Sequence, residues 1–210
     1  AVDRDVALSV SAPIIWGLDV ARYGGDNSAL CVRQGNTVLE IKSFQSMDLM
    51  QLCGAIKNKY DDCTALERPQ EILIDVIGLG SGVVDRLAEQ NLPVRGINVA
   101  EAPATKKNYL NLRAELWFSI KDWLAQRDCR LPNDDELVSE LAAPIYKYTS
   151  SGKIKLESKE EMRKRGIKSP DKADALSLTM ASSAASFSGS MSFMGYNFRQ
   201  PLKSKIIRIG

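Results

Sequence analysis

The sequence predicts an α/β fold, in which a mixed sheet of three antiparallel strands followed by parallel strands is flanked by helices and carries an added β-hairpin. Segments that alternate apolar and polar residues, separated by turn signals, occupy the stretch up to residue 45, which is typical of antiparallel strands. Beyond that stretch, short apolar runs alternate with helical spacing, which indicates parallel pairing. No linker-like stretch divides residues 12–186 of the 210-residue chain, so we expect one domain.

The first three strands come from local patterns. Residues 14–19 (IIWGLD) form an apolar run that ends in an acid, as in a buried strand. After the dense turn signal at residues 23–27, residues 28–33 and 37–44 alternate apolar and polar residues around Gln34-Gly35-Asn36, which predicts a hairpin.

After residue 45, segments with the helical spacing of apolar residues alternate with short apolar runs. Apolar residues with helical spacing predict helices, and short apolar runs predict strands. A glycine-rich tight turn at residues 78–82 connects one strand to its helix, and the helical aromatics Trp117, Phe118 and Trp123 are expected in the core. The expected elements are a helix over 47–60, a strand over 71–75, a helix over 83–90, a strand over 93–99, helices over 107–126 and 134–141, a hairpin over 145–157, and helices over 159–165 and 171–185.

Composition excludes several classes of protein. With 44% hydrophobic and 26% charged residues the chain is typical of globular proteins. No run approaches the roughly 18 apolar residues that span a bilayer, and no signal pattern opens the chain, so we expect an intracellular protein with no membrane partner. Histidine is absent and no cysteine pair has C-x-x-C spacing, which excludes histidine-based catalysis and the usual zinc sites.

Positive charge is concentrated late in the chain. Residues 147–172 contain nine basic and four acidic residues, a net charge of 9 − 4 = +5. Such a strip points to a polyanionic partner, although a solvated surface is an equally good interpretation. We expect residues 1–11 to be an N-terminal extension and residues 187–210 to be a loosely ordered basic tail.

Two aspartates are the first candidates for chemistry, because Asp19 and Asp75 each end an apolar strand. If the two strands are neighbours, their ends lie about 4.8 Å apart. Carboxylates that close repel one another unless a proton or a cation lies between them, and Mg²⁺ or Mn²⁺ is the simplest neutraliser. The alternative is that each aspartate only ends its strand in a turn.

A third acid follows in the segment SPDKADAL. Ser169 is expected to cap a helix with Pro170 at its first position, which places Asp171 and Asp174 on one helical face. Asp171 could simply complement the helix dipole. Asp174 lies among Ala and Leu, where a carboxylate needs a partner such as a metal, Lys172 or a nearby arginine.

Three such acids suit two divalent ions about 3.5–4 Å apart, the arrangement that hydrolyses phosphodiesters. We therefore expect Asp19, Asp75 and Asp174 to be catalytic and to bind metal, with Asp171 as an additional ligand. The basic strip would then hold a phosphate backbone. The residues expected to bind DNA are Lys147, Lys153, Lys155, Arg163, Lys164, Arg165 and Lys168.

Three motifs together resemble the nuclease domain of a tailed-phage terminase large subunit, of the headful DNA-packaging type. These are GLDVARYGGDNS at residues 17–28, ILID at residues 72–75 with its glycine-rich turn, and SPDKADAL at residues 169–176, and the resemblance covers roughly residues 12–185. It implies an RNase H-like fold and Mg²⁺- or Mn²⁺-dependent cleavage of concatemeric double-stranded viral DNA in the host cytoplasm. It also implies three partners: the terminase ATPase domain, the small terminase subunit and the capsid portal.

Two other functions stay open at this point. An actin-like or sugar-kinase-like nucleotide binder could use Asp19 and Gly24-Gly25 to grip phosphates, although 210 residues are few for two lobes. A non-catalytic DNA-docking module would keep the basic strip and use the acids structurally.

Overall fold

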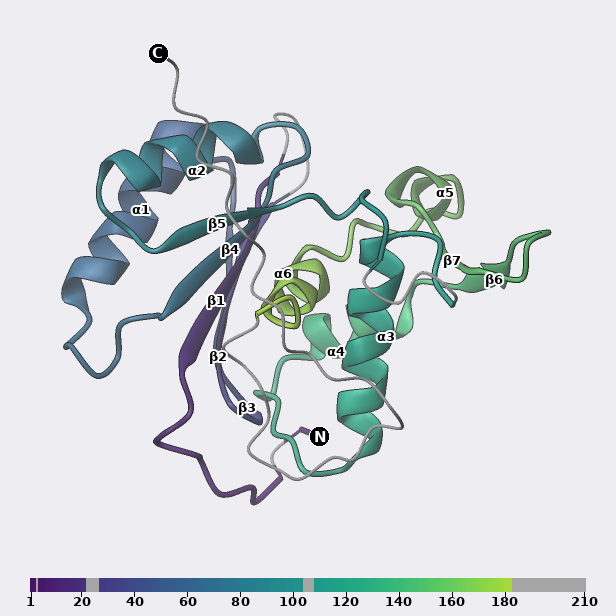
Figure 1. Ribbon diagram of the computed structural model, residues 1–210, viewed down its shortest axis with the longest axis horizontal. Coiled ribbons are helices and arrows are strands. Elements are labelled where there is room, and N and C mark those ends of the chain that lie inside the picture. Colours follow the sequence, from purple (N-terminus) through teal and green to yellow (C-terminus); the bar gives the residue numbers. More distant parts are fainter. Residues whose placement is uncertain (3, 22–26, 104–107, 183–210) are drawn as a thin grey trace, which may run out of the picture.

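The computed structural model describes residues 1–2, 4–21, 27–103 and 108–182. Its main feature is a five-stranded mixed sheet with the order β3-β2-β1-β4-β5 (Figure 1). A separate two-stranded sheet, β6-β7, is the predicted hairpin. The strands are β1 (Ile14–Asp19), β2 (Ser28–Gln34), β3 (Thr37–Phe44), β4 (Glu71–Asp75), β5 (Val94–Ile97), β6 (Tyr146–Tyr148) and β7 (Ile154–Leu156).

The pairing confirms the predicted mixed sheet. β1, β2 and β3 pair antiparallel in chain order, whereas β4 pairs parallel to β1 and β5 pairs parallel to β4. β1 is thus the central strand, which explains why all six of its residues are buried.

Six helices accompany the sheet in the described part of the chain. Side-chain caps begin several of them: Asp48 and Ser158 form capping boxes, and Asn111 and Asp134 also accept backbone N–H bonds. The helices are α1 (Leu49–Asp62), α2 (Gly80–Glu89), α3 (Leu112–Ala125), α4 (Asp135–Ala142), α5 (Lys159–Lys164) and α6 (Asp171–Thr179).

Helices cover both faces of the sheet (Figure 1), and clusters of buried apolar side chains lie between the helices and the sheet. On one face, α1 and α2 pack their buried residues, such as Ile56 and Leu87, against Trp16 and Ile74 of the sheet. On the other face α6 lies directly on the sheet, and α3 and α4 pack outside α6. Every residue of α6 is buried, so this short helix is the centre of the second core.

Helix α6 can lie on the central strand because Gly17 has no side chain. A Cβ atom at Gly17 would be 2.1 Å from the carbonyl oxygen of Ala175, far inside van der Waals contact. The glycine in the middle of an apolar strand therefore marks a close backbone approach. This contact sets how near the N-terminal half of α6 comes to the end of β1.

Some predicted boundaries were wrong. α2 begins at Gly80 within the glycine-rich turn, α3 begins only at Leu112, and α6 ends at Thr179. The predicted cap of α6 was also wrong, because Pro170 is the N-cap and the Ser169 hydroxyl makes no hydrogen bond.

A partner from elsewhere in the fold replaces that cap. The carboxylate of Glu140, on α4, accepts a hydrogen bond of 2.9 Å from the backbone N–H of Ala173. A tertiary contact thus satisfies the helix N-terminus that a local serine was expected to satisfy.

The structure describes only some of the residues in the predicted turn and terminal segments. The turn at residues 23–27, apart from Asn27, and the tail at 187–210 lie outside the described residues. The extension at residues 1–11 includes an isolated bridge between Val2 and Leu131. Among the described residues, no helix combines the length and apolar character needed to cross a bilayer.

Candidate functional site

The parallel pairing of β1 and β4 brings Asp19 and Asp75 to one edge of the sheet. Leu18 pairs with Ile74, and the next residue on each strand is an aspartate. Asp19 and Asp75 therefore lie side by side at the carboxyl ends of neighbouring strands. Ligand sites in open α/β sheets favour this edge. The predicted adjacency of the two strand ends is therefore present.

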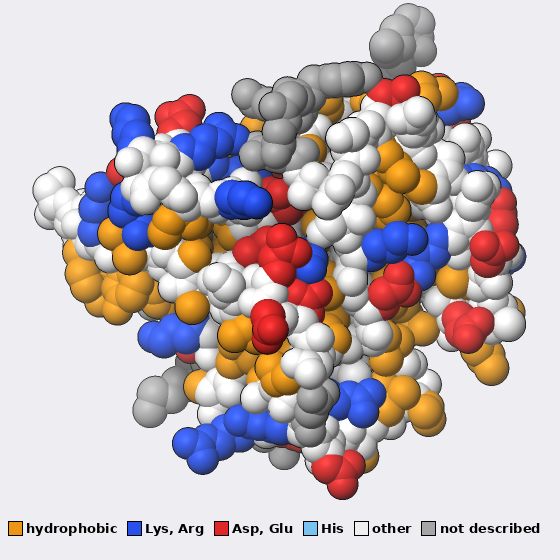
Figure 2. Space-filling model, turned by 180° about the vertical axis from the view of Figure 1, so that it is seen from behind, with side chains coloured by type: hydrophobic (Ala, Val, Ile, Leu, Met, Phe, Trp, Pro, Cys, Tyr) orange, Lys and Arg blue, Asp and Glu red, His pale blue; other side chains and the backbone are white. Residues whose placement is uncertain are grey.

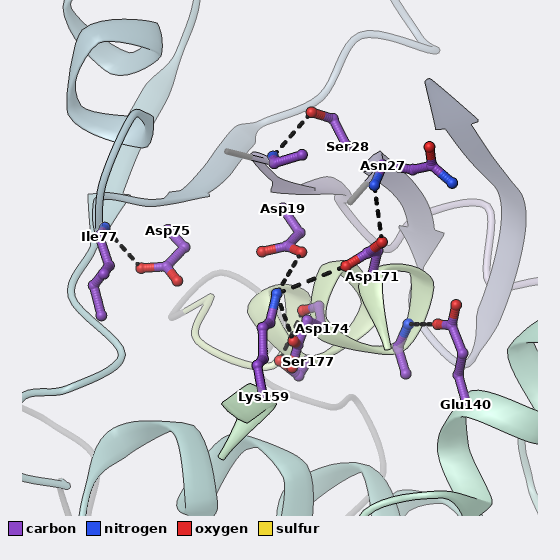
Figure 3. A network of polar contacts seen from close by, with 12 residues as sticks. Asp19, Asn27, Ser28, Asp75, Ile77, Glu140, Lys159, Asp171, Asp174 and Ser177 are labelled. Atoms are coloured by element: carbon purple, nitrogen blue, oxygen red, sulfur yellow. Dashed lines mark hydrogen bonds and ion pairs between the residues drawn. The ribbon is translucent and has the colours of Figure 1, made fainter. Parts of the chain in front are cut away.

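Helix α6 carries the other two predicted acids, Asp171 and Asp174. The side chain of Lys159 contacts both of them and Asp19 (Figure 3). The ammonium Nζ of Lys159 lies 3.1 Å from Oδ2 of Asp19, 3.1 Å from Oδ2 of Asp174 and 3.8 Å from Oδ1 of Asp171. Lys159 is the first residue of α5, directly after the hairpin. A single cation thus contacts carboxylates from the strand β1 and the helix α6.

The carboxylate of Asp174 has further donors on α3. The indole Nε1–H of Trp117 donates to Oδ1 at 2.8 Å, and Nη2 of Arg113 lies 3.2 Å from the same oxygen. Arg113 also donates to the backbone carbonyl of Glu157, next to β7, at 2.8 Å. Asp174 is therefore held by Trp117 and Arg113 of α3 and by Lys159 of α5, as expected of a buried carboxylate.

Asp75 stands to one side of this cluster (Figure 3). Its Oδ1 accepts a hydrogen bond of 3.1 Å from the backbone N–H of Ile77, in the turn that follows β4. Asp75 nevertheless lines the same cavity, of about 460 Å³, as the other three acids. The cavity joins all four predicted acids to Lys159 and Arg113.

Burial and crowding set the protonation of Asp19. Burial raises the pKa of Asp19 to about 7, Lys159 counteracts part of that rise, and the neighbouring carboxylates of Asp174 and Asp171 add to it. Burial alone would lower the pKa of Lys159, but Asp19, Asp174 and Asp171 outweigh it and raise that pKa above its ordinary value. The pocket therefore holds more negative charge than one ammonium group neutralises.

The other two acids differ from Asp19. Burial tends to raise the pKa of Asp174, but Arg113 and then Lys159 outweigh it, so this pKa is lowered. Burial raises the pKa of Asp75, and the bond from Ile77 offsets only part of the rise. The ionised form of Asp174 is thus stabilised by its neighbours. An additional cation would stabilise the ionised forms of Asp19 and Asp75.

The residues fit a divalent metal by their chemistry. All four are carboxylates, the oxygen ligands that Mg²⁺ and Mn²⁺ prefer, and the Lys159 ammonium already contacts three of them. As they stand, no three Asp, Glu or Cys side chains of the described chain are arranged closely enough to hold an ion. Asp19, Asp171 and Asp174 instead turn toward Lys159, so a metal would need this ammonium to move aside.

Two of the predicted DNA-binding residues, Lys155 and Arg163, line the same cavity as the acids, and the seven differ in their contacts. Figure 2 shows acidic side chains near the middle of one face, with Lys and Arg on either side. Lys147 and Lys155 of the hairpin both pair with Glu161, at 3.0 and 3.5 Å. Arg165 makes a two-pronged ion pair with the buried Glu157.

The remaining basic residues lie at the outer side of the same region. Arg163 lines the 460 Å³ cavity and also a second cavity of about 540 Å³, which Lys168 lines as well. Lys164 is exposed on α5, and Lys153 is partly exposed just before β7. The basic strip therefore continues past the edge of the acidic pocket.

Three residues of this site, Lys159, Arg113 and Trp117, were not assigned to it from the sequence, although an arginine was expected as one possible partner of Asp174. Lys159 was counted in the basic strip without a role of its own, and nothing in the local sequence distinguishes it from its neighbours. Trp117 was assigned to the core, where it does lie, with 7% of its surface exposed. The four-residue spacing of Arg113 and Trp117 places both on one face of a helix, which was the available signal.

No known family profile matches this sequence, and neither does any curated protein. Solved structures do match it. The nuclease domain of the large terminase subunit of bacterial virus Sf6, solved with manganese and beta-thujaplicinol, aligns with a TM-score of 0.72 at 21% identity, covering 83% of this chain and 90% of that one.

Two further matches come from other phages. The large terminase nuclease of thermophilic phage G20c with bound magnesium aligns with a TM-score of 0.61 at 15% identity, over 81% of each chain. The nuclease domain of Thermus phage P74-26 aligns at 0.57 and 14% identity, over 79% of this chain and 78% of that one. The expected resemblance and the RNase H-like fold are confirmed: this chain has the fold of terminase nuclease domains.

Proposed function

We propose that this chain is a metal-dependent endonuclease that cuts concatemeric double-stranded viral DNA during genome packaging. The observation that carries the proposal is that Asp19, Asp171 and Asp174 lie around the Lys159 ammonium. Asp75 lines the same cavity. The matched terminase nucleases, which include structures with manganese, magnesium and cobalt, support it.

The roles of the acids follow from their positions. Asp19, Asp75 and Asp174 would hold two Mg²⁺ or Mn²⁺ ions, with Asp171 as an additional ligand. When bound, such ions activate a water and stabilise the leaving oxygen of a phosphodiester. The chain supplies the rigid carboxylates: Asp19 is fixed by the central strand, and Asp174 is fixed by Trp117 and Arg113.

The basic residues would hold the DNA backbone beside these acids. Lys155 and Arg163 line the cavity itself, which supports a role for them in contacting the phosphates on either side of the cut bond. Lys147, Lys153, Lys164 and Lys168 would extend this contact, and Arg165 would support it by tying α5 to Glu157. The partners proposed by resemblance are the terminase ATPase domain, the small terminase subunit and the capsid portal.

Cleavage of supercoiled plasmid in Mn²⁺ tests the proposal. We expect the wild-type chain to cut, and Asp75→Asn to lose at least 100-fold in rate, because an amide is a poor ligand for a hard cation. Asp62→Asn, an exposed acid at the end of α1 on the other face of the sheet, is the matched control and should cut normally.

Undiminished cutting by Asp75→Asn would refute the site assignment. DNA binding without cutting, and without a metal-induced shift in melting temperature, would favour the docking module. Tight ATP binding by calorimetry would favour the nucleotide binder.

A further inference from the structure

The two oxygens of the Asp174 carboxylate have different surroundings. Oδ1 accepts the buried hydrogen bond from the indole Nε1–H of Trp117 at 2.8 Å, while Oδ2 lies 3.1 Å from the Lys159 ammonium. The Lys159 ammonium takes the central position among three of the acids. One oxygen of Asp174 therefore faces that position, and the other faces α3.

We propose that Trp117 is a positioning residue that determines which divalent ions the site accepts, because it reserves Oδ1 of Asp174 and leaves Oδ2 as the ligand. This inference rests on the proposed function, since it takes Asp174 as a metal ligand. Trp117 would touch neither the ion nor the DNA and would act only through Asp174.

Trp117 is better suited to this selection than Arg113. Nη2 of Arg113 lies 3.2 Å from Oδ1 and 3.4 Å from Oδ2, so it attracts the whole carboxylate and hardly distinguishes its oxygens. The indole N–H is a single donor that cannot accept, and it contacts Oδ1 alone. The ring is held in the core with Ala173 and Leu176, so the donor direction is fixed.

The bond is specific to this tryptophan. The indole N–H groups of Trp16 and Trp123 are also buried, yet within the described residues neither has a hydrogen-bond partner. Packing tryptophans into this fold thus does not require an indole bond. Trp117 combines the same burial with a bond to one particular carboxylate oxygen.

A carboxylate restricted to one oxygen discriminates between ions. Ca²⁺ takes six to eight oxygen ligands and readily binds both oxygens of a carboxylate, whereas Mg²⁺ requires near-octahedral geometry with fewer ligands. Reserving Oδ1 therefore costs Ca²⁺ a ligand that Mg²⁺ does not use. Trp117 favours the smaller ion, and it also pre-orients Asp174 for that ion.

Calorimetric titration of Mg²⁺ and Ca²⁺ into the chain tests the inference without any measurement of cleavage. In Trp117→Phe we expect Mg²⁺ affinity to fall about tenfold, as is usual when a hydrogen-bond partner of a metal ligand is removed. Ca²⁺ affinity should fall less or rise, so the ratio of the two dissociation constants moves toward Ca²⁺.

Trp123→Phe is the matched control, because it removes the same atoms from the same helix without removing a hydrogen bond. It should keep the wild-type ratio. If the phenylalanine variant fails to fold, benzothienylalanine at position 117 keeps the shape of the ring and removes only the N–H. An unchanged ratio in either variant at position 117, or an equal shift in Trp123→Phe, overturns the inference. Absence of Mg²⁺ binding by the wild-type chain refutes the proposed function instead.

Discussion

At the scale of single residues, Lys159 is the cation that contacts three of the four acids. Its ammonium group contacts Asp19, Asp171 and Asp174, which come from two different elements. Removing one partner of a buried ion pair leaves uncompensated charge, which typically costs about 3–5 kcal/mol. Lys159 therefore stabilises the cluster of acids and, if they bind metal as proposed, would compete with the ion.

Replacing Lys159 should separate these two effects. In Lys159→Met we expect the metal-free chain to lose about 2 kcal/mol, less than for a fully buried pair because 34% of the lysine side chain is exposed. We also expect Mn²⁺ to bind more tightly and to restore the melting temperature. Differential scanning calorimetry with EDTA and with Mn²⁺ measures both.

Lys164→Met, an exposed lysine on the same helix, is the control and should change neither quantity. Equal behaviour of the two variants would show that Lys159 does not neutralise the acids.

The raised pKa of Asp19 would make the proposed metal binding depend on pH. Burial is the chief cause that raises this pKa from 3.8 to about 7, so we expect the side chain to lose its proton between pH 6 and pH 8. A metal must displace that proton, so we expect Mn²⁺ affinity to rise from pH 6 to pH 8 with release of up to one proton. Calorimetry in buffers of different ionisation enthalpy measures the release. Constant affinity across this range would contradict the assignment.

The raised pKa of Asp19 also makes the stability of the metal-free chain depend on pH. The folded-state pKa of Asp19 is raised above its unfolded value, so the folded chain binds more protons between about pH 4 and pH 7. This group's contribution to the stability of the metal-free chain is therefore lost as pH rises through that window.

At the scale of elements, the contact between β1 and α6 brings the acids together. Gly17→Ala would place a methyl group 2.1 Å from the Ala175 carbonyl, so α6 must move away from the strand. We expect a loss of about 1–3 kcal/mol, as for other overpacked cores, and weaker Mn²⁺ binding because Asp174 moves with the helix. Urea unfolding and calorimetry measure the two effects.

Gly54→Ala is the matched control, since nothing lies within 4 Å of a Cβ atom there. Position 54 is inside α1, where alanine should stabilise by about 0.5–1 kcal/mol. A Gly17 variant as stable as this control would contradict the proposed close approach.

The hairpin is the second element with a testable role. Lys147 and Lys155 both pair with Glu161 on α5, on the side of the hairpin next to the cavity. For the double variant Lys147→Ala/Lys155→Ala we expect weaker binding to duplexes of any sequence, with the salt slope of log K reduced by about 2. Fluorescence anisotropy at several salt concentrations measures the slope.

Lys57→Ala, on α1 at the other face of the sheet, is the control and should leave the slope unchanged. An unchanged slope in the hairpin variant would place the DNA elsewhere on the surface.

At the scale of the whole molecule, the apolar cores stabilise the fold by contacts other than those of the acids. None of the clusters of buried apolar side chains on the two faces of the sheet includes Asp19, Asp75, Asp171 or Asp174. We therefore expect EDTA to leave the far-ultraviolet circular dichroism unchanged. Mn²⁺ at about 100 times its dissociation constant should add about 2.7 kcal/mol, and Asp75→Asn should abolish most of that gain. Unfolding by EDTA would contradict this separation.

Much of the fold was predictable because its elements carry local signals. The alternation in residues 28–44 and the apolar runs at β1 and β4 predicted the strands, and the observed register confirms them. The errors occur where a distant partner decides the outcome. Glu140 caps α6 in place of Ser169, and residues 108–110 pair with the hairpin near Ile154 and do not begin α3.

The sequence alone determined that Asp19 and Asp75 end apolar strands, and that Asp171 and Asp174 share a helical face, because strand and helix periodicities are local. Only the tertiary structure decided what surrounds these acids. Lys159 meets Asp19 across 140 residues and Trp117 meets Asp174 across 57, contacts that no local pattern encodes. The physical reason is that a buried carboxylate takes whichever donors the packing of distant elements brings within hydrogen-bonding distance.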